Sequence, residues 1–170
     1  IPDGMSYEDA AALPFGATTA LSFLGRSGLQ KGDRLSVNGA AGAVGVATLQ
    51  LARAMGIETV AVSTAPNHEL VLSLGASRAI DYRHAALFAR DDSYAAVMDT
   101  VGNLSLAKVA PFLAAKGAVL AVVGLPGPAD LPHLLGGKRV VGGMASGSAA
   151  RIAEVARLAA AGTLRPVIGR

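Results

Sequence analysis

The chain contains no cysteine and no tryptophan, and only 4% of its 170 residues are aromatic. Without cysteine, disulfide bonds and thiolate metal sites are excluded. The three histidines, His68, His84 and His133, show no metal-ligand spacing, so each is expected to be a surface or loop residue. Charged residues make up 16% of the chain and hydrophobic residues 52%. This composition suits buried parallel strands that are covered by helices.

Basic residues are few and scattered, with a formal net charge of +3 and no basic run longer than Lys138-Arg139. Nucleic-acid surfaces usually cluster basic residues and interleave them with aromatic ones, so no nucleic-acid partner is expected. The longest apolar stretch, residues 109–125, is interrupted by a proline, a lysine and a glycine and is too broken to span a membrane. No signal peptide is recognisable, and we predict a cytoplasmic protein without a membrane partner.

The segment 35–45, LSVNGAAGAVG, is the most informative motif of the chain. A short apolar run ends in a glycine-rich turn, and helix-compatible residues follow over 44–55. Glycines let the backbone approach a pyrophosphate, and a helix start offers free N–H groups and a positive dipole end. The spacing is Ala40-x-Gly42-x-x-Gly45, with alanine in place of the first glycine of the common dinucleotide motif. The motif predicts dinucleotide binding, with close strand–helix packing as the alternative, and disfavours a P-loop because no Gly-Lys-Ser/Thr follows.

Hydrophobic periodicity and turn residues divide the whole chain into alternating strands and helices. The expected strands are 34–37, 58–62, 79–81, 95–99, 118–123 and 139–142, and the expected helices are 6–13, 18–24, 44–55, 67–74, 105–113 and 151–161. Residues 124–137 are expected to form a loop. The alternation indicates a doubly wound α/β fold of the Rossmann type, with a parallel sheet of about six strands and helices on both faces. Residues 1–170 are predicted to form one domain, with a helical segment 1–30 before the core 31–170.

In such a sheet, ligands bind at the carboxyl ends of the strands, where the strand order reverses. The first expected strand ends at the glycine turn, the fourth at Asp99-Thr100-Val101-Gly102 and the fifth at Val123-Gly124. These three ends are therefore predicted to line one crevice. We interpret Asp99 as a cap of the turn that follows it rather than as a ligand contact.

The end of the second expected strand bears on the choice between NAD and NADP. A carboxylate there would accept hydrogen bonds from the ribose 2′-hydroxyl and would repel a 2′-phosphate. The segment 62–67 reads VSTAPN and is followed by no acid before Glu69. Ser63, Thr64 and Asn67 can donate hydrogen bonds to a phosphate, which favours NADP over NAD. The segment contains no Arg or Lys, and its residues are also ordinary turn formers.

Several segments together give the chain a family resemblance. SVNGAAGAVGVATLQLARAMG, LGASRAIDYR and VMDTVG resemble the cofactor domain of the medium-chain dehydrogenases/reductases, in particular the zinc-independent quinone oxidoreductases. The opening IPDGMSYEDAAALPFGATTALSFL resembles the junction between that family's catalytic and cofactor domains. The resemblance runs from Ile1 to Arg170. It implies hydride transfer between NADPH and a quinone or an α,β-unsaturated carbonyl compound, and it identifies no catalytic residue in this chain.

The resemblance also assigns positions around the cofactor. It places Ala41, Gly42, Ala43, Val44 and Gly45 at the pyrophosphate, Ser63, Asn67 and Tyr82 around the 2′-phosphate, Thr100, Val101 and Gly102 at the adenine-side turn, Val123 and Gly124 beside the nicotinamide, and Thr18 near the cofactor. Asn67 replaces a lysine that is often present in the family. Tyr82 packing on a neighbouring helix and Thr18 capping its own helix are the structural alternatives. Pro14 stands where zinc-dependent members have a cysteine ligand, so the resemblance implies no metal in this chain.

The family's other domain supplies much of the substrate pocket, and the chain begins with Ile1 rather than methionine. We therefore expect an excised cofactor domain that binds NADP(H) but catalyses poorly or not at all by itself. The alternatives are the cofactor domain of a zinc-dependent alcohol dehydrogenase, a non-catalytic dinucleotide-binding sensor and, less favoured, a methyltransferase. The strand near 140–144 is expected at the edge of the sheet, where it could pair with a second copy in a homodimer.

Overall fold

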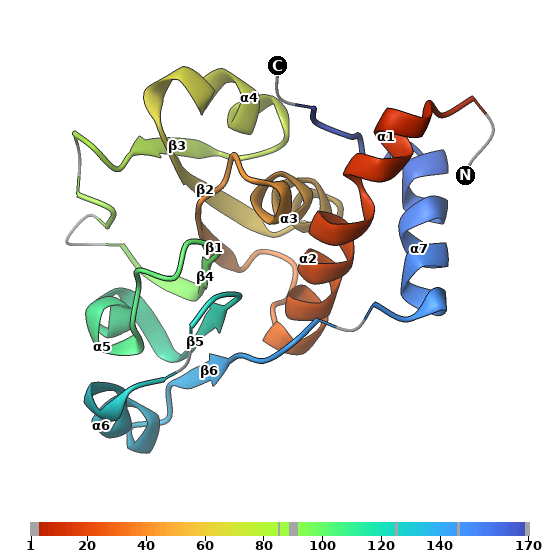
Figure 1. Cartoon of the computed structure of the whole chain (residues 1–170). Helices are drawn as coiled ribbons and strands as arrows, with labels where there is room; N and C mark the ends of the chain where they lie inside the picture. Colours follow the sequence, from red (N-terminus) through yellow and green to blue (C-terminus); the bar gives the residue numbers. More distant parts are fainter. Residues whose placement is uncertain (1–3, 85, 89–91, 125, 146, 169–170) are drawn as a thin grey trace.

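The computed structural model describes residues 4–84, 86–88, 92–124, 126–145 and 147–168. Its centre is a sheet of six parallel strands in the order β3-β2-β1-β4-β5-β6 (Figure 1). The strands are β1 (Arg34–Asn38), β2 (Glu58–Ser63), β3 (Arg78–Asp81), β4 (Tyr94–Asp99), β5 (Leu113–Ala121) and β6 (Arg139–Val141). This topology confirms the doubly wound α/β fold, and each of the expected strands is found.

Helices cover both faces of this sheet, as predicted. α2, α3, α4 and α7 lie on one side of it, and α5 and α6 lie on the other (Figure 1). The helices are α1 (Tyr7–Ala12), α2 (Pro14–Ser27), α3 (Ala43–Ala54), α4 (His68–Ser73), α5 (Leu106–Val109), α6 (Leu131–Leu135) and α7 (Ala149–Ala160), with 3-10 turns η1 (Ala65–Asn67), η2 (Ala110–Phe112) and η3 (Pro128–Asp130). Within the described residues, none of the helices has both the length and the apolar character that crossing a membrane requires.

Two hydrophobic clusters correspond to the two helical layers. Successive side chains of a strand point to opposite faces of the sheet. In β4, Ala96 and Met98 therefore join the cluster beneath α2 and α3, whereas Val97 joins the cluster beneath α5. Both faces of the central strands are buried, and β4 is almost continuously apolar, whereas β1 also buries the polar residues Ser36 and Asn38.

The second helix is longer than the sequence predicted. We expected it over 18–24 with its end at Gly25, but α2 begins at Pro14 and ends before Gly28. Proline is well tolerated at the first position of a helix, because the N–H that it lacks has no partner there in any case. Gly28 has φ 78° and is the left-handed residue that closes the helix. Gly25 lies on the open surface of α2 and does not interrupt it.

The predicted helix 105–113 is instead a short α5 followed by the 3-10 turn η2. Pro111 lies in η2, where its missing N–H prevents a regular continuation of α5. β5 begins at Leu113 rather than at 118. The register of its pairing with β4 shifts, because Tyr94 pairs with Leu113 whereas Ala96 pairs with Ala118. β5 ends at Ala121, so Val123 lies beyond the strand that was expected to include it.

The segment 124–137, expected to be a loop, contains η3 and α6. The buried carboxylate of Asp130 explains this local order. One of its oxygens accepts a hydrogen bond from Gly127 N at 2.8 Å, and the other accepts one from Ala107 N at 2.9 Å. The carboxylate thus joins the start of η3 to α5, a contact between segments 23 residues apart that local sequence patterns do not reveal.

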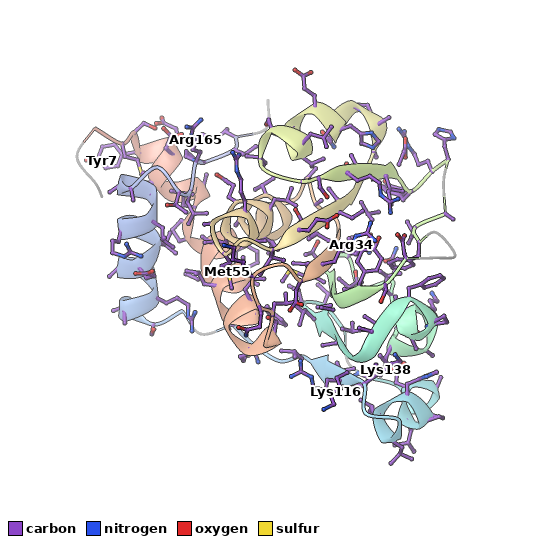
Figure 2. The ribbon with its side chains drawn as sticks, turned by 180° about the vertical axis from the view of Figure 1, so that it is seen from behind. Tyr7, Arg34, Met55, Lys116, Lys138 and Arg165 are labelled. Atoms are coloured by element: carbon purple, nitrogen blue, oxygen red, sulfur yellow. The ribbon has the colours of Figure 1, made fainter. Side chains whose placement is uncertain are left out.

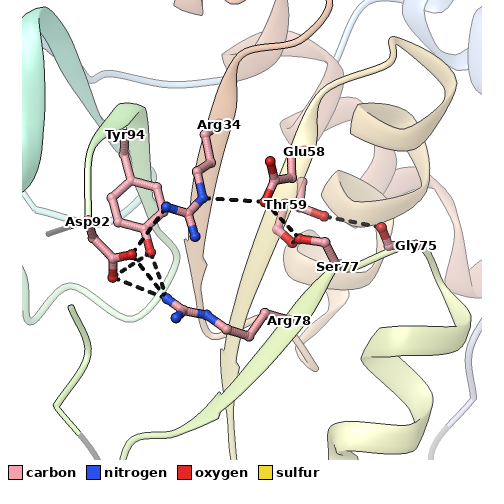
Figure 3. A network of polar contacts seen from close by, with 8 residues as sticks. All are labelled: Arg34, Glu58, Thr59, Gly75, Ser77, Arg78, Asp92 and Tyr94. Atoms are coloured by element: carbon pink, nitrogen blue, oxygen red, sulfur yellow. Dashed lines mark hydrogen bonds and ion pairs between the residues drawn. The ribbon is translucent and has the colours of Figure 1, made fainter. Parts of the chain in front are cut away.

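A polar network closes the amino ends of the strands (Figure 3). The buried carboxylate of Asp92 is 3.1 Å from Arg34 Nη1 and 3.1 Å from Arg78 Nη2, and it accepts a 3.0 Å hydrogen bond from the Tyr94 hydroxyl. Arg34 Nε also lies 3.4 Å from a carboxylate oxygen of Glu58. Because these residues come from the starts of four neighbouring strands or from just before them, the network fastens this edge of the sheet. Burial and the bond to Asp92 raise the pKa of Tyr94, which stays protonated.

Candidate functional site

The candidate site lies at the carboxyl ends of the strands, opposite the Asp92 network. β1 is paired with β2 on one side and with β4 on the other. The chain proceeds from β1 toward β3 in one direction and from β4 toward β6 in the other, so the strand order reverses between β1 and β4. The glycine turn after β1, the loop 63–67 after β2 and the turn 99–102 after β4 meet at this edge. The sequence predicted the ends of β1, β4 and β5 here, and β5 reaches the turn after β4 through a hydrogen bond from Val122 N to Asp99 O at 3.0 Å. Such a reversal is where open α/β sheets bind ligands.

The glycine turn is tied to both neighbouring strand ends. Gly39 and Ala40 donate backbone hydrogen bonds to Val62 O at 3.2 and 3.0 Å, and Gly42 N donates to Gly39 O at 3.0 Å. Gly39 has φ 79°, a conformation that favours glycine. A Cβ at Gly39 would also overlap the hydroxyl oxygen of Thr100. The first turn residue is therefore a glycine for structural reasons.

The third glycine of the motif, Gly45, serves the packing of α3 on β1. A Cβ there would lie 2.6 Å from the backbone Cα of Ala40. Gly16 on α2 has a similar function, because a Cβ there would lie 2.7 Å from the carbonyl carbon of Ala43. Gly16 was not among the residues predicted from the sequence. Its position two residues before Thr18, in a Gly-x-Thr segment, was the available signal.

Gly42 differs from these glycines. Its φ is −80°, which any residue adopts, and a Cβ there would meet its nearest neighbour, Gly39 O, at an ordinary 3.4 Å. The packing of the protein therefore does not require a glycine at this position. Gly42 is the N-cap of α3, and no side-chain cap hydrogen bond is found there among the described residues. The missing side chain leaves the first N–H groups of a 12-residue helix open to an anion.

The remaining residues assigned to the pyrophosphate line this opening in different ways. Gly42 and Ala43 are exposed and Ala41 is half-buried, whereas Val44 and Gly45 are buried. Close strand–helix packing, the alternative interpretation of the motif, thus applies to Gly45. The residue types present at Gly42 and Ala43 fit a pyrophosphate at the positive end of α3.

Asp99 is a structural cap, as interpreted from the sequence. One carboxylate oxygen accepts hydrogen bonds from Val101 N and Gly102 N, each at 3.0 Å, and from Asn38 Nδ2 at 2.9 Å. The other oxygen accepts one from Leu104 N at 2.8 Å. The carboxylate thereby fixes the turn after β4 and joins it to the end of β1.

Thr100 strengthens the same junction, because its hydroxyl donates a 2.7 Å hydrogen bond to Asn38 O. The side chain of Val101 is 53% exposed at this edge. Gly102 has φ 87°, and a Cβ there would lie 2.9 Å from Val123 Cγ1. The turn after β4 is therefore held by its own hydrogen bonds and leaves Val101 exposed.

The loop after β2 contains the residues assigned to the 2′-phosphate. Ser63 is buried, and its hydroxyl donates a 3.4 Å hydrogen bond to Thr64 O. Asn67 Nδ2 donates to the Thr64 hydroxyl at 3.2 Å. Tyr82 N donates to Ser63 O at 3.4 Å, and the Tyr82 side chain is 54% exposed rather than packed into a helix interface. The structure therefore gathers these four residues at one place.

The structure adds two charged residues that the sequence reasoning did not place here. Asp81, at the end of β3, is paired in register with Ser63, and its carboxylate accepts a 3.0 Å hydrogen bond from Ala65 N. Arg83 donates to the same carboxylate from its backbone N–H at 2.9 Å and from its guanidinium at 3.2 and 3.3 Å. These hydrogen bonds hold the pKa of the Asp81 carboxyl well below its usual range. The signal in the sequence was only that Asp81 and Arg83 flank Tyr82.

Thr18 and Gly124 meet at a separate apolar hollow of about 470 Å³, which Phe15, Phe23 and Val122 also line. Thr18 lies inside α2 and its hydroxyl donates to Pro14 O at 2.6 Å, so it does not cap its own helix as the structural alternative supposed. Val123 lines another hollow, of about 300 Å³, beside Gly102. Gly124 lines this second hollow as well, so it borders both hollows, whereas Val123 does not share a hollow with Thr18.

The described residues include no group of three or more His, Cys, Asp or Glu side chains that could hold a metal ion. Of the three tyrosines, Tyr82 lies at the candidate site and the other two lie elsewhere. Tyr94 is fully buried at the amino ends of the strands. Tyr7 is 81% exposed on α1, at the outside of the molecule (Figure 2).

The model of the family described as "Zinc-binding dehydrogenase" matches residues 43–161. The chain belongs to this family, which confirms the resemblance to the cofactor domain of the medium-chain dehydrogenases/reductases. It is 38% identical over 104 residues to the 2-methylene-furan-3-one reductase of Solanum lycopersicum, covering 60% of this chain and 27% of that protein. It is 31% identical over 200 residues to the mitochondrial NAD(P)H oxidoreductase RTN4IP1 of Mus musculus, covering 99% of this chain and 50% of that protein.

Solved structures of quinone oxidoreductases have the same fold. The enzyme of Coxiella burnetii superimposes with a TM-score of 0.86 at 25% identity, covering 96% of this chain and 52% of that one. The quinone oxidoreductase of Thermus thermophilus, solved also with NADPH, superimposes with a TM-score of 0.74 at 30% identity, covering 100% of this chain and 56% of that one. The chain thus spans about half the length of these oxidoreductases or less.

Proposed function

We propose that the chain binds NADP(H) along the carboxyl edge of the sheet. We further propose that it is the cofactor domain of an enzyme that transfers hydride between NADPH and a quinone or an α,β-unsaturated carbonyl compound. The observation that carries the proposal is the open start of α3 at Gly42, where the packing tolerates a side chain but none is present. A dinucleotide pyrophosphate gives that position a reason to be glycine, because the phosphates must approach the backbone closely.

The loop after β2 supports NADP over NAD. Ser63, Thr64 and Asn67 offer hydrogen-bond donors, and no acid occurs within 62–67. Tyr82, exposed beside Ser63, provides a further hydroxyl. The name of the mouse relative includes both dinucleotides, and the Thermus structure was solved with NADPH. These observations favour a 2′-phosphate at this loop.

The adenine-side turn and the hollow around Thr18 complete the proposed site. Asp99 and Thr100 hold the turn after β4 in place, so that Val101 and Gly102 can support the adenosine part without rearrangement. Thr18 and Gly124, together with the apolar side chains around them, would position the nicotinamide and exclude water from it. When bound, NADPH supplies the hydride, and the protein's part is to orient its reactive carbon toward the substrate.

The substrate class rests on the names of the relatives. Quinones and conjugated enones are electron-poor acceptors that take a hydride readily, and the names of the similar proteins include quinone oxidoreductases and a methylene-furanone reductase. We propose a zinc-independent enzyme because Pro14 stands where zinc-dependent members have a cysteine ligand. The cytoplasmic location remains a prediction.

We also propose that β6 pairs with β6 of a second copy. β6 is the edge strand of the sheet, as the sequence predicted, so its outer backbone groups face away from β5. The mass of the chain in solution tests this part by light scattering. A dimer that Val140→Pro converts to a monomer supports edge pairing, since proline removes a backbone donor. A wild-type monomer contradicts it.

The function itself is tested by calorimetric titration of the chain with NADPH and, separately, with NADH. Tighter binding of NADPH is expected, and Ser63→Ala with Asn67→Ala should reduce that preference. Equal binding, or tighter binding of NADH, would contradict the assignment to NADP. No binding of either dinucleotide would contradict the proposed site.

A further inference from the structure

Among the described residues, Arg83 is the one arginine whose guanidinium is held by hydrogen bonds beside the loop after β2. It follows β3 directly, and its side chain forms a two-pronged pair with the carboxylate of Asp81. The oxygen of Asp81 that accepts from Arg83 Nη2 also accepts from Ala65 N. The Asp81 carboxylate therefore connects the guanidinium to the backbone of the loop that contains Ser63 and Thr64.

The guanidinium has capacity for a second acceptor. Arginine has five N–H donors on its side chain, and the pair with Asp81 uses one on Nε and one on Nη2. Nothing else in the described part of the chain accepts a hydrogen bond from this side chain, and 47% of it is exposed. Nearby, the carboxylate of Asp81 accepts one hydrogen bond from Ala65 N and three from Arg83, so its oxygens are well occupied.

We propose that Arg83 is a specificity-determining residue that binds the 2′-phosphate of NADP(H) with the N–H groups that Asp81 leaves free. Arginine is suited to phosphate because its planar fork donates two parallel hydrogen bonds and its charge is permanent. Asp81 restricts the side chain before the ligand arrives, which reduces the entropy lost on binding. This inference rests on the proposed function, since it names a further residue for the same cofactor site.

A purely structural role for Arg83 leads to a different expectation. If Arg83 only held Asp81, and Asp81 only held the loop at Ala65, then removing Arg83 would disturb the adenosine ribose of both dinucleotides alike. A direct contact with the 2′-phosphate affects NADPH alone, because NADH lacks that group. The ratio of the two affinities therefore separates the two roles.

The test is calorimetric titration of the wild-type chain, Arg83→Gln and Arg83→Lys with NADPH and NADH. Arg83→Gln should weaken NADPH binding about tenfold and change NADH binding less than about twofold. Arg83→Lys should lose only part of the affinity for NADPH, since it keeps the charge but not the fork. Arg157→Gln is the matched control: it also removes an arginine paired with a carboxylate, Glu154, but on α7, and should change neither affinity.

A double variant decides whether Arg83 acts directly or by neutralising Asp81. With Asp81→Asn and Arg83→Gln together, neither charge remains. A persisting loss of NADPH affinity supports direct contact, whereas recovery to the wild-type value overturns it.

The remaining outcomes separate this inference from the proposed function. A wild-type preference for NADPH that Arg83→Gln leaves unchanged, or an equal loss for both dinucleotides, overturns the role of Arg83 while the assignment to NADP stands. A wild-type chain that binds NADH as well as NADPH, or binds neither, overturns both proposals.

Discussion

Gly42→Asp is expected to raise the stability of the chain while abolishing dinucleotide binding. A Cβ at Gly42 has room, with Gly39 O as its nearest neighbour at 3.4 Å. The new carboxylate can accept hydrogen bonds from the N–H groups of the first turn of α3. N-capping and the helix dipole together should increase the free energy of unfolding by a few tenths to about 1 kcal/mol. Urea unfolding of the free chain measures this change.

The same carboxylate would lie where we place the pyrophosphate. Steric exclusion and repulsion between like charges should lower the affinity for both NADPH and NADH by about a hundredfold or more, which calorimetry measures directly. Gly42→Asn is the matched neutral variant, because its amide also caps the helix but carries no charge. Its loss of affinity should be smaller than that of Gly42→Asp.

Gly45→Ala should behave in the opposite way. A Cβ there would lie 2.6 Å from backbone atoms of Ala40, which cannot move without displacing the end of β1. We expect a loss of at least about 2 kcal/mol in the free energy of unfolding. If Gly42→Asp bound dinucleotides like the wild type, or lost stability like Gly45→Ala, the assignment of the open start of α3 to the pyrophosphate would be refuted.

Three further predictions concern carboxylates. Asp99→Asn places an N–H₂ group against backbone donors and should lower the free energy of unfolding by about 2 kcal/mol, which urea unfolding measures. It should also weaken the binding of both dinucleotides, which titration measures. Asp92→Ala should lower the free energy of unfolding by about 2 kcal/mol, because it leaves Arg34 and Arg78 without this partner. It should leave dinucleotide affinity unchanged, because Asp92 lies at the opposite edge of the sheet, and a change in affinity would contradict that separation. The pKa of Asp81 is lowered in the folded chain, so its stabilising contribution is present above its ordinary pKa near pH 4 and is lost as the pH falls below it. The stability difference between the wild type and Arg83→Gln should therefore shrink on acidification, and a constant difference would refute this.

The fold could be predicted because its signals are local. Alternating apolar runs, the glycines that follow several helices and the turn residues each depend on a few neighbouring positions. The bounds of α2 were wrong although their signals are local, because its end was expected at Gly25 rather than before Gly28. Two other errors occur where distant contacts decide. α6 forms in a segment expected to be a loop because Asp130 joins it to α5, and β5 starts early because Leu113 pairs with Tyr94.

The candidate site shows the same division. The glycine turn was recognisable in the sequence, but the different reasons for its glycines were not. Gly39 and Gly45 are required by neighbouring backbone and side-chain atoms, and Gly42 is not. Val123 and Gly124 are adjacent in sequence, yet only Gly124 shares a hollow with Thr18. Space around a residue is a property of the packed structure and cannot be taken from spacing alone.

The choice between NADP and NAD depends on such a contact. Within 62–67 the absence of an acid favours NADP, but the fold brings the carboxylate of Asp81 to Ala65 N from the neighbouring strand. By itself that carboxylate would repel a 2′-phosphate. Arg83 compensates its charge, and together with Ala65 N it occupies the oxygens that a ribose hydroxyl would otherwise need. The proposed preference for NADPH therefore depends on Arg83, and we expect replacement of this residue to shift the chain toward NADH.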